Sequence, residues 1–189
     1  MKKVIGITGT IASGKNVVRD LIKKKFSSYT VSLSSIIRGE LERKKPDFNR
    51  VSLQDLGNEL RKKYGNEILA KLAVEYMQRD KDVLIIDGIR NPGEVEFLRK
   101  KFGKNFVLIG VDAPREIRFE RIVKRKKRTD PKTWEEFLIV DERDQGKGEP
   151  DYGQQTKKCL ELADFLIIND GSLEDLEKKV NEVISKIMS

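Results

Sequence analysis

Short apolar runs are the clearest pattern along this chain. The runs Val83–Asp87, Phe106–Val111 and Phe165–Ile168 are nearly continuous in apolar residues, Val4–Thr8 is a fourth run, and Tyr29–Leu33 is a weaker fifth. Continuous rather than alternating apolar residues are typical of strands that are covered on both faces, as in a parallel sheet. We therefore expect these runs to be strands of one sheet.

Segments with helical periodicity separate the apolar runs. The longest, Asp55–Arg79, is expected to form two helices broken near Gly65, because glycine weakens a helix. The others are Asn16–Lys25, Ser34–Lys44, Pro92–Lys101, Pro114–Lys127, Pro131–Gln145 and Ser172–Ile187. The alternation of strands and helices predicts an α/β fold, in which a doubly wound parallel sheet is the middle of three α/β/α layers.

The chain contains no Pro/Gly/Ser-rich linker, so residues 1–189 are expected to form one domain. The segment Lys124–Asp151 differs from its surroundings. It is dense in charge, contains KRKKRTDP and ends in DQGKGEPDYG. We interpret it as a mobile lid on the same domain.

Composition narrows the possible chemistry. Of 189 residues, 38% are hydrophobic and 37% charged, with a net charge of +8, which suits a folded protein with a basic surface for anionic partners. Histidine is absent, which excludes Ser-His-Asp and Cys-His catalysis. Cys159 is the only cysteine and is expected to be an ordinary buried residue. Met1–Gly9 does not resemble a signal peptide and no stretch approaches 18 apolar residues, so we expect a cytoplasmic protein that does not interact with membranes.

A phosphate-binding motif follows the first apolar run. Gly9, Gly14 and Lys15 fit G-x-x-x-x-G-K, with a predicted strand before the motif and a predicted helix after it. Small residues allow backbone N–H groups to turn toward phosphate oxygens, Lys15 adds a positive charge, and the helix N-terminus faces the same anion. Asn16 stands where Ser or Thr usually supplies a hydroxyl to Mg²⁺. Its carbonyl oxygen can also bind Mg²⁺, directly or through water.

Arginines follow later strands. Arg38 lies in SLSSIIRGE after the Tyr29–Leu33 run, where the serines can cap the next helix, and Arg90 lies in DGIRNP after the Val83–Asp87 run. Two arginines at neighbouring strand ends can bind one phosphate. Asp87, at the end of its strand, can hold metal-bound water.

A third set of basic residues lies near the expected lid. Arg118, Arg121 and Arg125 recur at helical spacing beside an apolar stripe, as suits an anion in a cleft. Arg128 and Arg143 bracket the lid, and Arg128 is expected to swing inward on closure and help to exclude water.

The stretches ITGTIASGK, SLSSIIR, DGIR, ERIVKR and ADFLIINDGSLEDLEKKV resemble the nucleoside-monophosphate-kinase-like P-loop kinases, and among them the dephospho-CoA-kinase-like and archaeal adenylate-kinase-related branch. The resemblance spans nearly the whole chain. It implies a five-stranded sheet in the order 2-3-1-4-5, an acceptor-binding helical insert at about residues 33–80 and a helical lid at about residues 125–152.

The resemblance also implies a role for each matching residue. The ATP phosphates would be held by Gly9, Thr10, Ile11, Ala12, Ser13, Gly14, Lys15, Asn16 and Val17. The catalytic set would be Lys15, Asp87, Arg121 and Arg125, and Asn16 and Asp87 would hold Mg²⁺, mainly through water. The acceptor would be bound by Ser32, Arg38 and Arg90, the lid would contribute Arg128 and Arg143, and Asn169, Gly171 and Ser172 would lie beside adenine.

Four departures leave the acceptor open. Asn16 replaces Ser or Thr, and the acceptor motifs of authentic dephospho-CoA kinases are not evident. The DGIR turn lacks the Pro-Arg of adenylate kinases, and the chain also lacks their long zinc-type lid. AMP, CMP, a deoxynucleotide and dephospho-CoA all remain candidates.

The sequence thus predicts an ATP- and Mg²⁺-dependent phosphotransferase acting on a small, phosphorylated, nucleotide-like acceptor. Such chemistry relies on positioning and charge neutralisation and needs no histidine. Two alternatives remain: a P-loop ATPase with an RNA-related or regulatory role, and a nucleotide-binding module without catalysis. Aromatic residues are sparse at 7% and do not interleave with the basic runs, which argues against nucleic acid as a partner. The sequence does not specify an oligomeric state.

Overall fold

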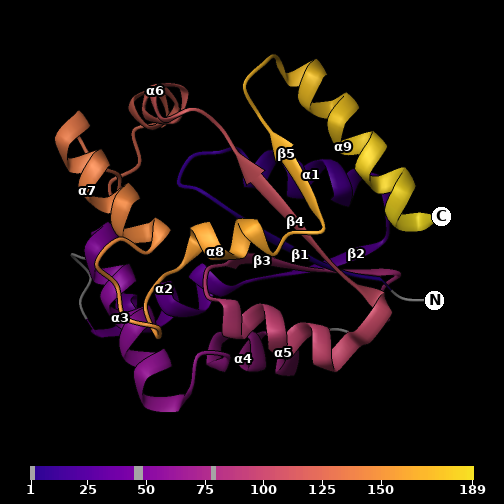
Figure 1. The fold of residues 1–189 in the computed structure, drawn as a ribbon, viewed down its shortest axis with the longest axis horizontal. Coiled ribbons are helices and arrows are strands. Elements are labelled where there is room, and N and C mark those ends of the chain that lie inside the picture. The colour runs from indigo at the N-terminus through magenta and orange to yellow at the C-terminus, as the bar shows by residue number, and fades with distance from the viewer. Residues whose placement is uncertain (1–2, 45–48, 78–79) are drawn as a thin grey trace.

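The computed structural model describes residues 3–44, 49–77 and 80–189, and its centre is one parallel sheet (Figure 1). The strands are β1 (Lys3–Gly9), β2 (Ser28–Ser32), β3 (Val83–Ile89), β4 (Phe106–Asp112) and β5 (Phe165–Ile168). They lie in the order β2-β3-β1-β4-β5, and every neighbouring pair is parallel. The predicted fold class and strand order are confirmed, including the weakest of the expected strands.

Helices occupy the intervals between strands. They are α1 (Lys15–Lys25), α2 (Leu33–Lys44), α3 (Arg50–Tyr64), α4 (Ile68–Glu75), α5 (Pro92–Phe102), α6 (Arg115–Arg125), α7 (Trp134–Gln145), α8 (Thr156–Glu161) and α9 (Leu173–Met188), with a 3₁₀ turn η1 (Gly103–Asn105). Successive strand residues face opposite sides of the sheet. Ile5 and Ile7 of β1 pack in the cluster that includes α1 and α9, whereas Val4 packs in the cluster that includes α2, α4, α5 and α8. The sheet is therefore covered on both faces, as Figure 1 shows.

The starts of two predicted helices need correction. Helix α7 begins at Trp134, not Pro131, because Thr133 caps it by accepting a hydrogen bond from the backbone of Glu136.

Helix α3 begins at Arg50, not Asp55, because Asn49 accepts a hydrogen bond from the backbone of Ser52 and completes a capping box with its side chain. The predicted break near Gly65 is confirmed, and this glycine has a φ of 99°. The end of the expected segment, residues 78 and 79, lies outside the described residues.

Helix α8 was not predicted, because six residues are too few to show a helical period. It contains Cys159, which is 0% exposed, as expected for this residue, and burial raises the pKa of its thiol far above the usual range. The thiolate is therefore not formed near neutral pH.

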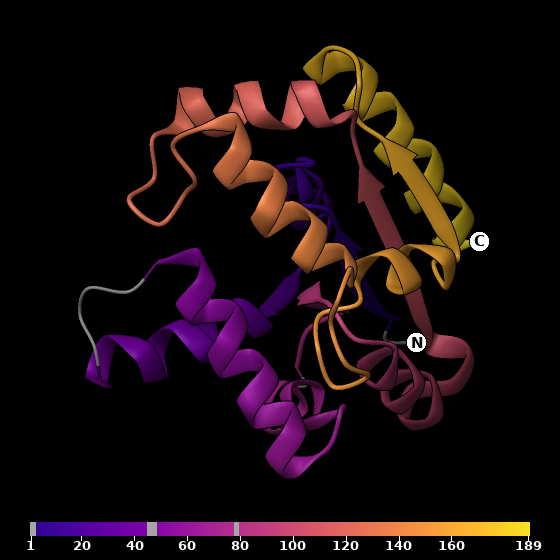
Figure 2. The ribbon, with the colours of Figure 1, turned by 60° about the vertical axis from the view of Figure 1, so that its left-hand side comes forward.

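The expected lid contains a packed helix. In α7, Phe137 and Val140 are buried against Ile122 of α6 and against Ile11, just after β1. Residues 126–133, between α6 and α7, form a connection that extends outward opposite α2 and α3 (Figure 2). Most residues of this connection are exposed, although Asp130 and Pro131 are buried.

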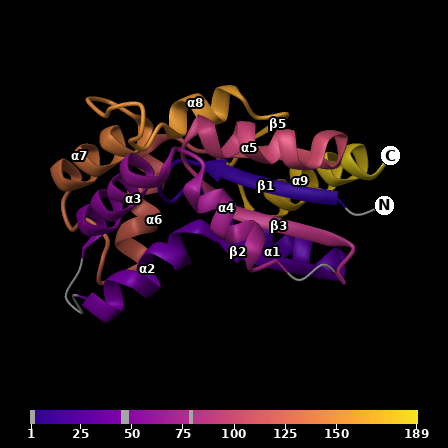
Figure 3. The ribbon, with the colours of Figure 1, turned by 90° about the horizontal axis from the view of Figure 1, so that it is seen from below.

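The helices α2, α3, α6 and α7 gather at one end of the molecule, the end to which the β1 arrow points (Figure 3). Because all strands are parallel, their carboxyl ends meet there, and open α/β sheets bind ligands at that edge. No helix in the described parts of the chain combines the length and apolar character needed to cross a bilayer.

A buried carboxylate joins the elements at this end. Glu94 of α5 is 0% exposed; its Oε1 accepts from Nε and Nη2 of Arg61 at 3.0 and 2.8 Å. Its Oε2 accepts from the backbone N–H groups of Arg90 and Asn91 at 2.8 and 3.1 Å. Glu94 therefore fixes α3, the start of α5 and the turn after β3 relative to one another.

We expect Glu94→Gln to lower the free energy of unfolding by about 3–5 kcal/mol, because it leaves the Arg61 charge buried without its counter-ion. Urea denaturation followed by circular dichroism measures this change. The control is Glu96→Gln, an exposed position two residues along the same helix, which should change stability by no more than about 0.5 kcal/mol. Equal effects of both substitutions would contradict the role given to Glu94.

Candidate active site

The segment Gly9–Lys15 forms a tight bend between β1 and α1. Gly9 and Gly14 have φ angles of 150° and 101°, which favour glycine, and Ala12 adopts a φ of 61°. A Cβ atom on Gly9 would lie 2.0 Å from the carbonyl oxygen of Val111, and one on Gly14 would lie 2.2 Å from Nδ2 of Asn169. At both positions, any other residue would place a Cβ atom too close to a neighbouring group and would have to adopt a backbone conformation that favours glycine.

Lys15 folds back over this bend. Its Nζ donates to the carbonyl oxygens of Gly9 and Thr10 at 2.8 and 2.6 Å. Burial, followed by the nearby charge of Arg90, lowers the pKa of Lys15 to about 7, although Asp144 and Asp87 oppose the shift. The amine is thus held at the bend in an environment that favours its neutral form until an anion binds.

Two of the predicted functional residues brace the bend. Asn169 donates from Nδ2 to the carbonyl oxygen of Ser13 at 2.8 Å, and Arg121 donates to the same oxygen at 3.4 Å and to that of Asn169 at 3.0 Å. Asn169 follows β5, so the bend is tied to the far edge of the sheet. Ser172 instead caps α9 with Asp175 and is exposed, as is Gly171 beside it.

A cavity of about 120 Å³ lies between the bend and the helices of the expected acceptor insert. Eight of the predicted residues line it: Ile11 and Ala12 of the bend, and the charged or amide residues Lys15, Asn16, Arg38, Asp87, Arg90 and Arg125. It is also lined by Ser34, Arg50, Gly88, Lys127, Thr129 and Asp130. We call this cavity the cleft. Its basic residues outnumber its two carboxylates, so it suits a polyanion.

Carboxylates partly neutralise the cleft. Arg90 is ion-paired with the buried Asp144, and Arg125 binds both oxygens of Asp130 at 2.6 and 2.8 Å. Arg50 has no hydrogen-bonded carboxylate partner in the described part of the chain, and burial, followed by the charge of Arg90, lowers its pKa to about 10. The site therefore contains uncompensated positive charge.

Other predicted basic residues lie apart from the cleft. Arg118 is 2% exposed and donates to Asp141 and to the carbonyl oxygens of Ala113 and Ile11, at 2.8 and 3.2 Å for the latter two. It supports the bend from α6, so the expected row of three arginines is not shared by one anion site.

The other predicted lid and acceptor residues also lie outside the cleft lining. Arg143 is ion-paired with Asp55 and Glu149, and Arg128 is exposed. Ser32 contacts the hydroxyl of Ser34, which does line the cleft.

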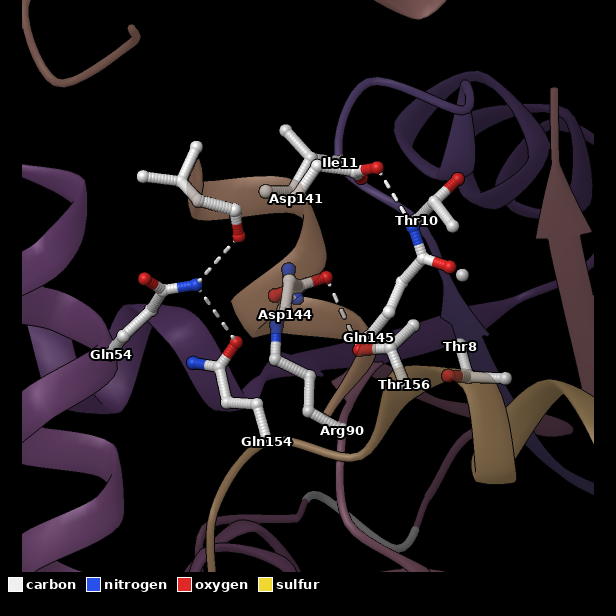
Figure 4. Close-up of polar contacts among 12 residues, drawn as sticks. Thr8, Thr10, Ile11, Gln54, Arg90, Asp141, Asp144, Gln145, Gln154 and Thr156 are labelled. Carbon is white, nitrogen blue, oxygen red and sulfur yellow. Dashed lines mark hydrogen bonds and ion pairs between the residues drawn. The ribbon is translucent and has the colours of Figure 1, made fainter. Parts of the chain in front are cut away.

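Figure 4 shows the interior side of this region, where side chains from α3, α7 and α8 meet the turn after β3. Asp144 contacts both Arg90 and the hydroxyl of Thr156, the latter at 3.2 Å. Sequence reasoning missed Arg50, Asp130 and Asp144, since none belongs to a motif. The only local signal was their position within the expected insert, for Arg50, and within the charged segment expected to form the lid, for Asp130 and Asp144.

The side-chain oxygens of Asp87 and Asn16, which are expected to hold Mg²⁺, both lie near the guanidinium group of Arg19. Arg19 Nη1 lies 3.1 Å from Oδ2 of Asp87 and 3.4 Å from Oδ1 of Asn16. Oδ1 of Asp87 is buried and has no hydrogen-bond partner among the described residues. This oxygen set fits Mg²⁺, but the described residues contain no cluster of three His, Cys, Asp or Glu side chains that could hold it alone. Phosphate oxygens and water would have to complete the coordination.

A wider hollow of about 1090 Å³ lies elsewhere, between the α3–α4 turn, α5 and residues 151–152. None of the bend residues lines it. We place the candidate site in the smaller cleft because charge, buried groups and the phosphate-binding bend converge there.

The strand order and the bend together are those of the P-loop kinase-like α/β fold. Solved structures with this fold include TT1252 from Thermus thermophilus, with a TM-score of 0.59 and 24% identity over 98% of this chain and 97% of that one. They also include a shikimate kinase from Bacteroides thetaiotaomicron, with a TM-score of 0.57 and 15% identity over 99% of both chains. At these identities the likeness establishes the fold alone.

Sequence relatives give the family. A model described as an AAA domain matches residues 5–146. The chain is 30% identical to the UPF0200 protein of Methanocaldococcus jannaschii over 98% of its own length and 91% of that protein. It is 32% identical to a UPF0200/UPF0201 protein of Archaeoglobus fulgidus, of which it spans only 56%. The protein therefore belongs to the UPF0200 family, and its residues 5–146 form an AAA domain.

The lowered pKa of Lys15 predicts that nucleotide binding takes up a proton above pH 7. Free Lys15 is mostly neutral there, and bound phosphates favour its charged form and so raise its pKa. Calorimetry of ATP binding at pH 8 in buffers of different ionisation enthalpy should therefore give different apparent enthalpies, and affinity should fall as pH rises further. Lys15→Arg keeps a permanent charge, so any binding that it retains should not depend on the buffer.

Arg19→Met should tighten Mn²⁺ binding in the presence of ADP by about tenfold or more, because it removes a positive charge beside the Asp87 and Asn16 oxygens. Electron paramagnetic resonance of free Mn²⁺ measures the affinity without any turnover. Arg19→Lys retains the charge and serves as the control. Unchanged affinity in Arg19→Met would show that Arg19 does not compete with the metal.

Proposed function

We propose that this protein is an ATP-dependent phosphotransferase that moves the γ-phosphoryl group to a small anionic acceptor, with nucleoside monophosphates and dephospho-CoA as the first candidates. The observation that carries the proposal is the convergence of Lys15 from the bend with arginines from four other elements in one cleft. A protein that only held a nucleotide would not need basic groups on the side facing away from the bend.

The donor side begins at the bend. Backbone N–H groups of residues 9–15 and the N-terminus of α1 would hold the β- and γ-phosphates, and Lys15 would leave its two carbonyl partners to contact them. Arg125 would release Asp130 and contact the transferred phosphoryl group instead. Arg121 contacts the bend backbone, so its role would be to keep the bend in shape. When Mg²⁺ is bound, it neutralises phosphate charge and orients the β- and γ-oxygens.

The acceptor side lies opposite. Arg38 of α2, Arg50 of α3 and Arg90 after β3 line the same cleft and would bind the anionic group of the acceptor. In the reaction, an acceptor oxygen forms a bond to the γ-phosphorus while the bond from that phosphorus to the β–γ bridging oxygen breaks, leaving ADP. A phosphate acceptor needs no base. A hydroxyl acceptor would give its proton to a carboxylate, for which Asp87 is the candidate.

The connection between α6 and α7 supports exclusion of water. Lys127, Thr129 and Asp130 of this connection line the cleft, so bound phosphates would contact it directly. Closure over the phosphates would keep water from taking the phosphoryl group.

The proposal is tested by measuring ADP release with ATP, Mg²⁺ and a panel of AMP, CMP, a deoxynucleotide and dephospho-CoA. Release that depends on an acceptor supports it. Release at the same rate without an acceptor indicates an ATPase, and ATP binding without release indicates a nucleotide-binding module.

For an acceptor found in this way, Arg38→Ala should raise the acceptor KM by roughly 10- to 100-fold, as expected for a lost charge-assisted hydrogen bond of about 1.5–3 kcal/mol. The KM for ATP should stay within about twofold. Lys24→Ala, which removes an exposed cation from α1, is the control and should leave both constants unchanged. An unchanged acceptor KM in Arg38→Ala would remove this arginine from the site.

A further inference from the structure

Helix α3 turns a polar stripe toward the protein interior. Gln54, Asn58 and Arg61 recur at i, i+4 and i+7, so they share one face of the helix, and they are only 1%, 8% and 2% exposed. A helix face in this position is ordinarily apolar. Three large polar side chains on it call for an explanation.

Each of these side chains leaves one buried atom without a hydrogen-bond partner among the described residues: Oε1 of Gln54, Oδ1 of Asn58 and Nη1 of Arg61. The rest of each group is bonded. Nε2 of Gln54 donates to the carbonyl oxygen of Val140 at 3.2 Å. It also donates to Gln154 at 3.4 Å, and Figure 4 shows this second contact. Unpaired buried polar atoms are rare because they are costly, and a ligand that pairs with them is one explanation.

Gln54 and Arg61 face a second, smaller cavity that continues from the cleft. This inner pocket has a volume of about 50 Å³ and shares Ser34, Arg38, Arg50, Gly88 and Arg90 with the cleft lining. Its remaining wall is apolar and consists of Leu33, Ile37, Leu53 and Leu69, and Gln154 completes it. Asn58 is not part of the lining.

The charges indicate what fits the inner pocket. The guanidinium of Arg61 is already paired with Glu94, so the pocket does not require a second anion beyond the one bound by Arg38, Arg50 and Arg90. Among the lining residues, Arg61 and Gln54 each have one buried side-chain atom without a partner: the donor Nη1 of Arg61 and the acceptor Oε1 of Gln54. A neutral hydroxyl-bearing group can satisfy both, since a hydroxyl donates and accepts.

The volume indicates how large that group is. An engineered protein cavity that binds benzene measures about 150 Å³, roughly three times the inner pocket. A six-membered ring therefore does not fit between α2 and α3 as they stand, whereas a hydroxyl or hydroxymethyl group does.

We propose that Gln54 and Arg61 are specificity-determining residues that bind the neutral, hydroxyl-bearing end of a compact acceptor, whose phosphate or carboxylate is held by Arg38, Arg50 and Arg90. This rests on the proposed function, because it takes the cleft opposite the bend as the acceptor side. It makes a small hydroxylated anion a better acceptor than a nucleoside monophosphate.

The test compares two phosphates of equal carbon number, glycerol 3-phosphate and propyl phosphate, by calorimetry with a non-hydrolysable ATP analogue filling the bend. Glycerol 3-phosphate should bind about three- to tenfold more tightly, the gain expected from one or two buried hydrogen bonds. In Gln54→Leu and in Arg61→Lys, the ratio of the affinity for glycerol 3-phosphate to that for propyl phosphate should fall to about one. The affinity for propyl phosphate itself should not change.

Asn58→Leu is the matched control, because it removes a buried amide with an unpaired oxygen from the same helix face but outside the pocket. It should keep the wild-type ratio. The proposal would be overturned if the wild-type protein bound glycerol 3-phosphate and propyl phosphate equally well, a result that needs no variant. It would also be overturned if Gln54→Leu kept the wild-type ratio of the two affinities. Tighter binding of AMP than of glycerol 3-phosphate would overturn it as well.

The two proposals fail separately. If no acceptor stimulates ADP release but the ratio behaves as described, phosphotransfer is wrong and the inner pocket still recognises hydroxylated anions. If ADP release depends on an acceptor but the ratio is one, phosphotransfer is supported and the role of Gln54 and Arg61 is wrong.

Discussion

The Glu94 carboxylate is the interaction on which the geometry of the acceptor side depends. It accepts from the Arg61 side chain and from the backbone of Arg90 and Asn91, and so connects α3, α5 and the end of β3. Two of these residues line the proposed binding surfaces: Arg90 lines both the cleft and the inner pocket, and Arg61 lines the inner pocket. A buried ion pair is expensive to desolvate, and its value here is positional. It sets the directions of two guanidinium groups before any ligand arrives.

The cleft also shows how a concentration of positive charge is tolerated in a folded chain. Each of three aspartates contacts one arginine: Asp144 contacts Arg90 in the turn after β3, Asp130 contacts Arg125 of α6, and Asp87 contacts Arg19 of α1. Each contact offsets charge repulsion that would otherwise oppose folding. Arg50 and Lys15 are left with depressed pKa values instead. Bound phosphates would relieve this repulsion, so binding and stability of the domain should be coupled.

The parts of the molecule that were predictable from sequence are those set by local patterns. Apolar runs located the strands, the resemblance supplied their order, and the glycine spacing of residues 9–15 located the bend. What could not be predicted depends on long-range contacts. Arg118 shares a helical arc with Arg121 and Arg125, yet Asp141, 23 residues later, draws it into the interior. Arg50 enters the cleft because the Asn49 cap starts α3 early, and Asp144 acts from α7, where nothing in the sequence distinguishes it from a surface carboxylate.

Cys159 has a practical consequence. Because the only thiol of the chain is enclosed beneath the sheet and resists ionisation, maleimide dyes should leave the native protein unlabelled. A single cysteine introduced at an exposed position of the α6–α7 connection would then carry the only fluorophore. Such a label would report in real time whether that connection moves when nucleotide binds, without first removing a native residue.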